Sequence, residues 1–68
     1  MTIHLEVNGS RRETPEGTTV SQLLMALDLL PARVAVERNR QILKRALFPT
    51  TRLQEGDRLE IVQFVGGG

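Results

Sequence analysis

The sequence predicts an α+β fold, a mixed sheet of four or five strands with one main helix packed across it. Residues 2–7 alternate strictly between polar and apolar side chains, which is typical of a half-buried strand. Residues 20–27 place apolar side chains at i, i+3, i+4 and i+7, which makes one apolar stripe on a helix. A hairpin, a helix and further strands in this order suit one sheet with the helix across a face. The residues that define these patterns are Ile3, Leu5 and Val7, and then Val20, Leu23, Leu24 and Leu27.

The first strand leads into a predicted hairpin. Asn8-Gly9 follows it, and this pair favours a type I′ turn because both central residues of that turn need a positive φ. The returning strand, roughly residues 11–14, is polar. We expect it at an edge of the sheet, where charged side chains oppose unwanted pairing.

The helix has recognisable start and stop signals. A Pro-Glu-Gly segment at residues 15–17 ends the hairpin. The hydroxyl of Thr18 or Thr19 can then accept a hydrogen bond from an unpaired N–H of the first turn. Pro31 is expected to stop the helix shortly after Leu30.

Three more strands are predicted after the helix. Residues 34–36 begin the third strand, which ends near residue 39; residues 41–45 form a short fourth strand, and residues 58–65 form the last. A turn at residues 55–57 precedes the last strand. The first and last strands are the most apolar and are expected at the centre, where parallel pairing between them is possible. Three apolar residues are expected to anchor the long connection to the core: Leu47, Phe48 and Leu53.

Composition excludes several kinds of site and partner. The chain has no cysteine, so it has no disulfide, thiolate zinc site, iron–sulfur cluster or cysteine nucleophile. With a single histidine, no metal site is expected. Nine basic and eight acidic side chains form no block of like charge, and Trp and Tyr are absent, so neither nucleic acid nor a membrane is an expected partner. No signal peptide or spanning segment is evident, and we expect a cytoplasmic protein that is a monomer when free.

The last three residues, Gly66, Gly67 and Gly68, directly follow an apolar strand. We therefore divide the chain into a folded domain, residues 1–65, and a flexible glycine tail, residues 66–68. Glycine reaches backbone conformations that are closed to other residues, so Gly66 and Gly67 can thread a narrow channel of another enzyme. The Gly68 carboxylate would then enter that active site, where adenylation would make it an electrophile. The alternative is a frayed terminus without a function.

The last strand carries a candidate docking surface. Alternation places Leu59 and Ile61 on the inward face, and Val62 and Phe64 on an outward face that begins with charged residues. Because exposed apolar clusters mark interaction sites, we expect Val62 and Phe64 to dock a partner. Alternatively, they cover a loop, or a bulge turns them inward.

No set of residues suggests catalysis by the chain itself. His4 lies on the outward face of the first strand, where it is a solvated surface residue or donates a hydrogen bond to a partner. The basic residues between positions 38 and 45 are interpreted as a solvated face. The sequence holds no Ser/His/Asp set, P-loop, paired-carboxylate site or GxGxxG loop. We therefore expect no catalytic residue.

Short motifs along the whole chain follow one recognisable order. They are Asn8-Gly9, Thr19-Val20-Ser21-Gln22-Leu23-Leu24, Val34-Ala35-Val36-Glu37-Arg38-Asn39, Ile42-Leu43-Lys44-Arg45, Glu55-Gly56-Asp57, Leu59-Glu60-Ile61-Val62 and Gly67-Gly68. In this order, and in so short a chain, they resemble the ThiS family, the sulfur carriers of thiazole biosynthesis in the thiamin pathway. The chain departs from the family at Lys44, where a proline often precedes the arginine, and at Leu47-Phe48, where a Trp is frequent.

The resemblance implies a β-grasp, ubiquitin-like fold and a role as a co-substrate rather than an enzyme. It implies that an E1-like adenylyltransferase of the ThiF type uses ATP to adenylate the carboxylate of Gly68. Sulfur would then replace one carboxylate oxygen and give a covalent thiocarboxylate. A thiazole synthase of the ThiG type would accept that sulfur, and the chain itself would bind no cofactor.

Three alternatives stay open on the sequence. The small subunit of molybdopterin synthase has the same fold and tail chemistry, although its chains usually run longer. A ubiquitin-like protein modifier also begins with adenylation of its terminal glycine, but its tail becomes an isopeptide. A pure interaction module would use the domain and not the tail.

Overall fold

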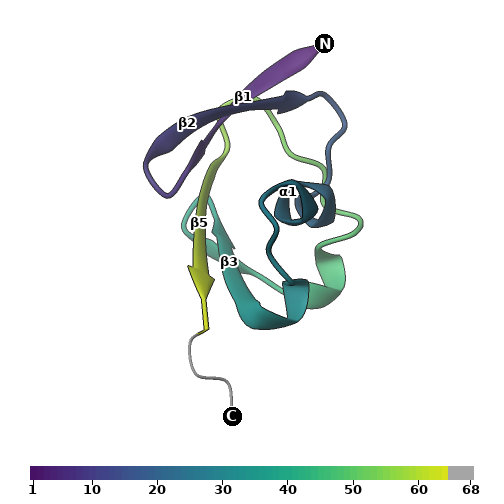
Figure 1. The fold of residues 1–68 in the computed structure, drawn as a ribbon. Helices are drawn as coiled ribbons and strands as arrows, with labels where there is room; N and C mark the ends of the chain where they lie inside the picture. Colours follow the sequence, from purple (N-terminus) through teal and green to yellow (C-terminus); the bar gives the residue numbers. More distant parts are fainter. Residues whose placement is uncertain (65–68) are drawn as a thin grey trace.

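The computed structural model describes residues 1–64 and contains, within them, one five-stranded mixed sheet with a helix across one face (Figure 1). The strand order is β2-β1-β5-β3-β4; β1 and β5 are parallel and the other neighbours are antiparallel. The fold class and the inner positions of the first and last strands are therefore confirmed. The elements are β1 (Thr2–Val7), β2 (Ser10–Pro15), α1 (Val20–Ala26), β3 (Val34–Arg38), β4 (Gln41–Leu43) and β5 (Arg58–Gln63), with 3₁₀ turns at Pro31–Arg33 and Arg45–Leu47.

The first hairpin has the predicted turn. Asn8 has φ 49° and Gly9 has φ 82°, so both central residues take the positive φ that a type I′ turn requires. β2 begins directly after this turn and runs one residue further at each end than predicted. It forms an edge of the sheet, as expected for a strand rich in charged side chains.

Thr19 begins the helix. Its hydroxyl accepts a hydrogen bond from the Gln22 N–H at 3.2 Å, and the Gln22 side chain accepts one from the Thr19 N–H at 2.9 Å. This reciprocal capping box satisfies two N–H groups at the start of the helix. Thr18 has another role, because its hydroxyl donates to the Pro15 carbonyl oxygen at 2.6 Å.

The helix ends a full turn before Leu30, so the predicted helix end was wrong. Asp28 adopts φ 59°, and its N–H donates to the Met25 carbonyl oxygen at 3.0 Å. The Leu29 N–H donates to the Leu24 carbonyl oxygen at 2.9 Å. These two bonds form a Schellman motif, which closes a helix through a left-handed residue. The sequence argument used the later proline as the stop, and that proline instead begins a 3₁₀ turn.

The core lies between α1 and the inward face of the sheet. Of the three anchors expected in the long connection, Phe48 and Leu53 are each 2% exposed, whereas Leu47 is 48% exposed. The prediction for Leu47 was wrong because successive side chains of a 3₁₀ turn point about 120° apart, so only one of two neighbours faces the core. The core residues are Ile3, Leu5, Val20, Leu23, Leu24, Val34, Val36, Phe48, Leu53, Leu59 and Ile61.

The last two strands are shorter than the sequence indicated. β4 stops at Leu43 rather than residue 45, because Arg45 begins a 3₁₀ turn. β5 stops at Gln63, and Val65 lies outside the described residues together with the tail, so the domain boundary at residue 65 stays a prediction. Within residues 1–64, no helix has the length and apolar character needed to cross a bilayer.

Candidate functional site: the outward end of β5

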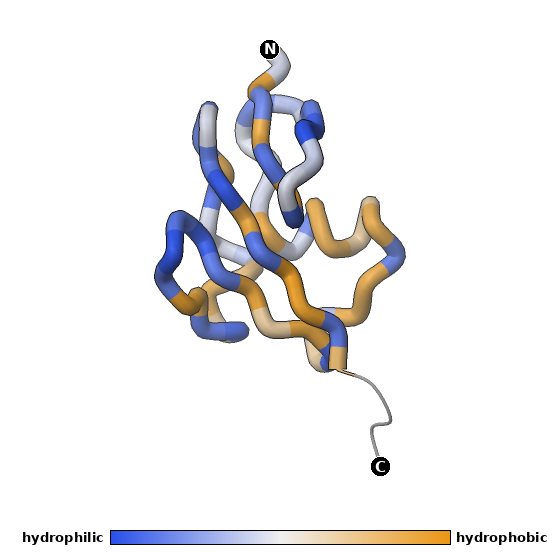
Figure 2. The backbone as a smooth tube through the Cα atoms, turned by 90° about the vertical axis from the view of Figure 1, so that its left-hand side faces the viewer, coloured by the Kyte–Doolittle hydropathy of each residue, from blue (hydrophilic) through white to orange (hydrophobic). Residues whose placement is uncertain are grey.

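β5 lies at the centre of the sheet and runs toward the glycine tail. Leu59 and Ile61 are 1% and 8% exposed, whereas Val62 and Phe64 are 59% and 51% exposed. The predicted alternation is therefore confirmed, and neither a loop nor a bulge hides the two apolar side chains. In Figure 2, the strand that leads into the grey trace is hydrophilic (blue) at its start and mostly hydrophobic (orange) near its end. Docking by Val62 and Phe64 stays a prediction.

Two residues that the sequence argument missed extend this surface. Ala35 of β3 pairs directly with Val62, which places both side chains on one face. Ile42 of β4 pairs with Glu37, two residues further along β3 on that same face, and Ile42 is 81% exposed. We call Ala35, Ile42, Val62 and Phe64 the outward apolar surface. A hollow of about 330 Å³ at this end of the sheet is lined in part by Ala35, Ile42 and Phe64.

The start of the same face is charged. Arg58 Nε lies 3.8 Å from Glu6 Oε2 on the neighbouring β1. Glu60 pairs directly with Glu37 across β5 and β3. Within residues 1–64, neither of these two glutamates forms an ion pair. The outward face of β5 therefore changes from charged to apolar as it approaches the tail.

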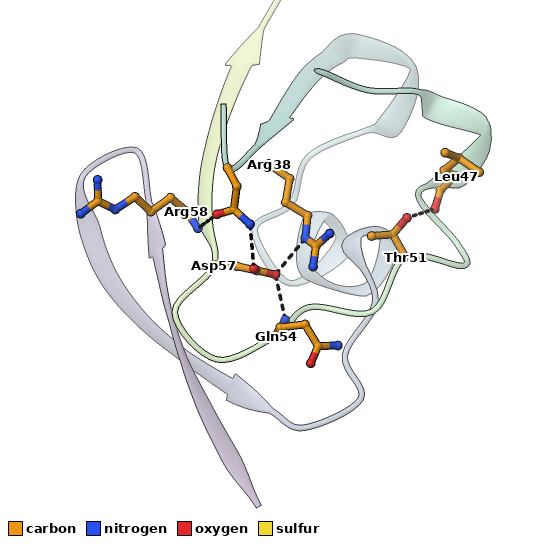
Figure 3. A network of polar contacts seen from close by, with 7 residues as sticks. Arg38, Leu47, Thr51, Gln54, Asp57 and Arg58 are labelled. Carbon is orange, nitrogen blue, oxygen red and sulfur yellow. Dashed lines mark hydrogen bonds and ion pairs between the residues drawn. The ribbon is translucent and has the colours of Figure 1, made fainter. Parts of the chain in front are cut away.

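A buried carboxylate fixes the turn before β5. Asp57 is 5% exposed and accepts hydrogen bonds from Arg38 Nε at 2.9 Å, Asn39 Nδ2 at 3.0 Å and the Gln54 N–H at 2.8 Å (Figure 3). The Asn39 side chain also accepts a bond from the Arg58 N–H at 2.9 Å. The first residue of β5 is thus tied to the β3–β4 turn.

These contacts set the charge state of Asp57. Burial raises the pKa of the Asp57 carboxyl group, but the hydrogen bonds from Gln54, Asn39 and Arg38 and the positive charge of Arg38 outweigh burial. The net result is a pKa below the ordinary value for aspartate. The carboxylate is therefore ionised at neutral pH and holds three segments together.

The basic residues between positions 38 and 45 are exposed except for Arg38, which is partly buried. Arg38 is committed to Asp57, and its side chain is 29% exposed. Arg45 Nε donates to the Pro31 carbonyl oxygen at 2.9 Å. The solvated-face interpretation was therefore wrong for Arg38, which is partly buried against Asp57. Arg45 is exposed, as that interpretation expected, although it also bonds the segment before β3.

His4 is held by carboxylates of its own chain. Its Nε2 lies 3.1 Å from Glu13 Oε1, and its Nδ1 lies 3.4 Å from Glu55 Oε1. Its backbone N–H also donates to Glu55 Oε1 at 3.0 Å. A hydrogen bond from the His4 ring to a partner protein would have to displace one of these carboxylates. The contacts favour a structural role for His4 at the surface.

The predicted tail residues, Gly66, Gly67 and Gly68, lie outside the described residues. Their threading and their chemistry stay predictions. In the part of the chain that the structure describes, no three His, Asp or Glu side chains converge as a metal site requires.

Comparison with known proteins assigns the chain to one family. The sequence model of the ThiS family matches residues 5–68. The chain belongs to the ThiS family. The ThiS sulfur carrier protein of Bacillus subtilis is 37% identical over 65 residues, which are 94% of this chain and 98% of that protein. The assignment confirms the resemblance to the ThiS family seen in the sequence.

A solved structure and a longer relative add to this assignment. The crystal structure of the thiamine biosynthesis protein ThiS from Geobacter metallireducens superposes with a TM-score of 0.80 at 38% identity, and covers 97% of this chain and 100% of that one. The match confirms the β-grasp fold of ThiS proteins. A thiazole synthase from Magnetococcus marinus is 46% identical over 68 residues, which are 100% of this chain but only 20% of that protein.

Proposed function

We propose that this ThiS-family chain carries sulfur on its C-terminal Gly68 and donates it to the thiazole ring of thiamin. The observation that carries the proposal is the family match, which extends through residue 68 and so includes the glycines. The proposal has three parts: activation of the carboxylate, docking of the activating enzyme, and delivery of the sulfur.

Activation requires an E1-like adenylyltransferase of the ThiF type and ATP. One oxygen of the Gly68 carboxylate attacks the α-phosphate of ATP and pyrophosphate leaves. Hydrosulfide, supplied by a sulfur donor, then attacks the acyl carbon and displaces AMP, and loss of the S–H proton leaves a thiocarboxylate. Gly66 and Gly67 have no Cβ and suit a narrow channel. The chain has no cysteine thiol that would capture the activated acyl group.

The outward apolar surface supplies the docking site for the activating enzyme. Val62 and Phe64 are more than half exposed, and they lie four and two residues before the first glycine of the tail. An enzyme that holds the tail therefore lies next to these side chains. Aromatic residues at the centre of an interface often contribute most of the binding energy, so Phe64 is the expected anchor.

A ThiG-type thiazole synthase is the proposed sulfur acceptor. The support is the Magnetococcus marinus protein, in which a segment similar to this whole chain makes up 20% of a thiazole synthase. Linkage in one polypeptide raises the effective concentration of a carrier at its acceptor. The family assignment also favours thiazole synthesis over the molybdopterin and protein-modifier alternatives.

A reconstituted sulfur transfer tests the delivery step and separates the alternatives. The thiocarboxylate form of the chain is mixed with a ThiG-type synthase and its small-molecule substrates, and in parallel with the large subunit of molybdopterin synthase and its precursor. The proposal expects thiazole in the first mixture and no dithiolene product in the second. The opposite pattern would replace thiazole synthesis with the molybdopterin alternative.

A further inference from the structure

The side-chain amide of Asn8 takes the place of a strand residue beside β5. β1 pairs with β5 only through Glu6 and Val7, which face Arg58 and Leu59. Beyond this point, Asn8 Oδ1 accepts a hydrogen bond from the Ile61 N–H at 2.7 Å, and Asn8 Nδ2 donates to the Ile61 carbonyl oxygen at 3.1 Å. The parallel ladder is therefore extended by one rung after β1 has turned into the hairpin.

The carboxamide of Asn8 makes both bonds at once. Ile61 offers one N–H donor and one carbonyl acceptor, so its partner must accept and donate together. An aspartate would place a carboxylate oxygen against the carbonyl oxygen. The positive φ of Asn8, 49°, and the bond from its own N–H to the Leu59 carbonyl oxygen at 2.9 Å hold the amide beside Ile61.

The two edges of β5 form different hydrogen bonds near the tail. On the β3 side, pairing continues to the last described residue, where the Phe64 N–H donates to the Arg33 carbonyl oxygen at 2.8 Å. On the β1 side, the bonds of the Asn8 amide to Ile61 are the hydrogen bonds nearest to the tail within residues 1–64. Without them, the strand hydrogen bonds of β5 from Ile61 to Phe64 would all come from the β3 side.

We infer that Asn8 is a positioning residue for the reaction at the C-terminus. Its amide fixes the direction of the end of β5, where the chain continues into the tail, relative to the outward apolar surface. The inference rests on the proposed adenylation of Gly68. Val62 and Phe64 set where the activating enzyme binds, and the Asn8 amide sets how the tail leaves that bound domain. A small change of exit direction displaces the reacting carboxylate, and a displacement of about 1 Å can cost about a hundredfold in rate.

Asn39 provides a matched control. It also has a positive φ, 52°, and its side chain also donates one hydrogen bond, to Asp57, and accepts one, from the Arg58 N–H. It braces the start of β5, whereas Asn8 braces the end. Glycine tolerates a positive φ, so Asn8→Gly and Asn39→Gly each remove two side-chain hydrogen bonds without straining the backbone.

The test compares the parent and both variants in ATP–pyrophosphate exchange with the ThiF-type enzyme, at a temperature where denaturation curves show all three folded. We expect Asn8→Gly to lower kcat about tenfold with KM changed less than about threefold, and Asn39→Gly to leave both near the parent values. Amide hydrogen exchange at Phe64, which neither side chain touches, should accelerate in Asn8→Gly alone. Should Asn8→Gly not fold, Asn8→Asp takes its place, since it keeps the acceptor for the Ile61 N–H.

The results test the positioning role of Asn8 separately from the proposed adenylation of Gly68. An equal loss of kcat in both variants would mark a general effect of stability and overturn the positioning role, as would an unchanged kcat in the Asn8 variant. A parent chain that supports no pyrophosphate exchange would reject the proposed adenylation itself. Normal exchange by the parent with no difference between the variants would reject only the role of Asn8.

Discussion

Arg38 Nε donates a hydrogen bond to Asp57 Oδ2 at 2.9 Å, and this contact ties the end of β3 to the turn before β5. The Asp57 side chain is 6% exposed and that of Arg38 is 29% exposed. Removing the carboxylate leaves the Arg38 guanidinium, the Asn39 amide and the Gln54 N–H without their acceptor. We expect Asp57→Ala to lower the free energy of unfolding by about 3 kcal/mol, as for one partner of a largely buried pair. Urea denaturation at pH 7 measures this, and a loss below about 1 kcal/mol would contradict it.

The same carboxylate predicts a pH dependence of stability. The folded-state pKa of Asp57 lies below its unfolded value, so its contribution is present above the unfolded pKa and is lost as pH falls through the folded one. The unfolded value is about 3.9. The difference in unfolding free energy between the parent and Asp57→Asn should therefore be constant from pH 7 to about pH 5 and shrink below about pH 4. A difference that grows on acidification would contradict the assigned direction.

Leu24 tests the core beneath the sheet. It is fully buried on α1, with 0% of its surface exposed, whereas its neighbour Met25 is 75% exposed. Leu24→Ala should lower the free energy of unfolding by about 2–5 kcal/mol through lost burial and a cavity. Met25→Ala, the control on the same helix, should change it by less than about 0.5 kcal/mol. Equal denaturation midpoints for the two variants would remove Leu24 from the core.

Phe64 tests the docking surface. Phe64→Ala should weaken binding to the ThiF-type enzyme by at least about tenfold, the effect of losing an aromatic anchor worth more than about 1.4 kcal/mol. Its unfolding free energy should stay near the parent value, because the side chain is half exposed. Met25→Ala is again the control, since its α1 lies on the other side of the sheet (Figure 1). Calorimetric titration that gives one affinity for all three proteins would reject the surface.

The facing pair Glu37 and Glu60 predicts a gain in stability. Like charges directly opposite each other across two strands are destabilising. Glu60→Gln should therefore raise the free energy of unfolding by a few tenths of a kcal/mol at low salt, and the gain should fade at high salt. Glu16→Gln, which makes the same change of net charge in an exposed turn, should give no such gain. A stability loss in Glu60→Gln would show that the pair does not repel.

Local patterns predicted the elements well. The alternation at Ile3, Leu5 and Val7 and the helical stripe around Leu24 each follow from burial on one face, and both were confirmed. The helix end was missed because it depends on Asp28 taking a left-handed conformation, which glycine adopts far more readily. The choice between Leu47 and Phe48 as the anchor depended on the phase of a 3₁₀ turn, which hydrophobicity alone does not set.

The site was only partly predictable for a different reason. Val62 and Phe64 were found from alternation within one strand, a local property. Ala35 and Ile42 join them only through the register of β3 with β5 and β4, which long-range pairing decides. The buried Asp57 was treated as a turn residue because its three donors come from distant or backbone positions. Polar contacts of this kind have no short sequence signature.

The central claim is that the carboxylate of Gly68 is the reacting group. The most direct measurement is the intact mass of the chain after incubation with the ThiF-type enzyme, ATP and a sulfur donor. We expect one oxygen of the parent chain to be replaced by sulfur. A chain lacking Gly68 should keep its mass and its denaturation midpoint, and Gly67→Val should convert slowly, because a β-branched side chain is bulky and stiff in a narrow channel. Equal thiolation of the parent and the chain without Gly68, or no mass change in the parent, would contradict the sulfur-carrier account.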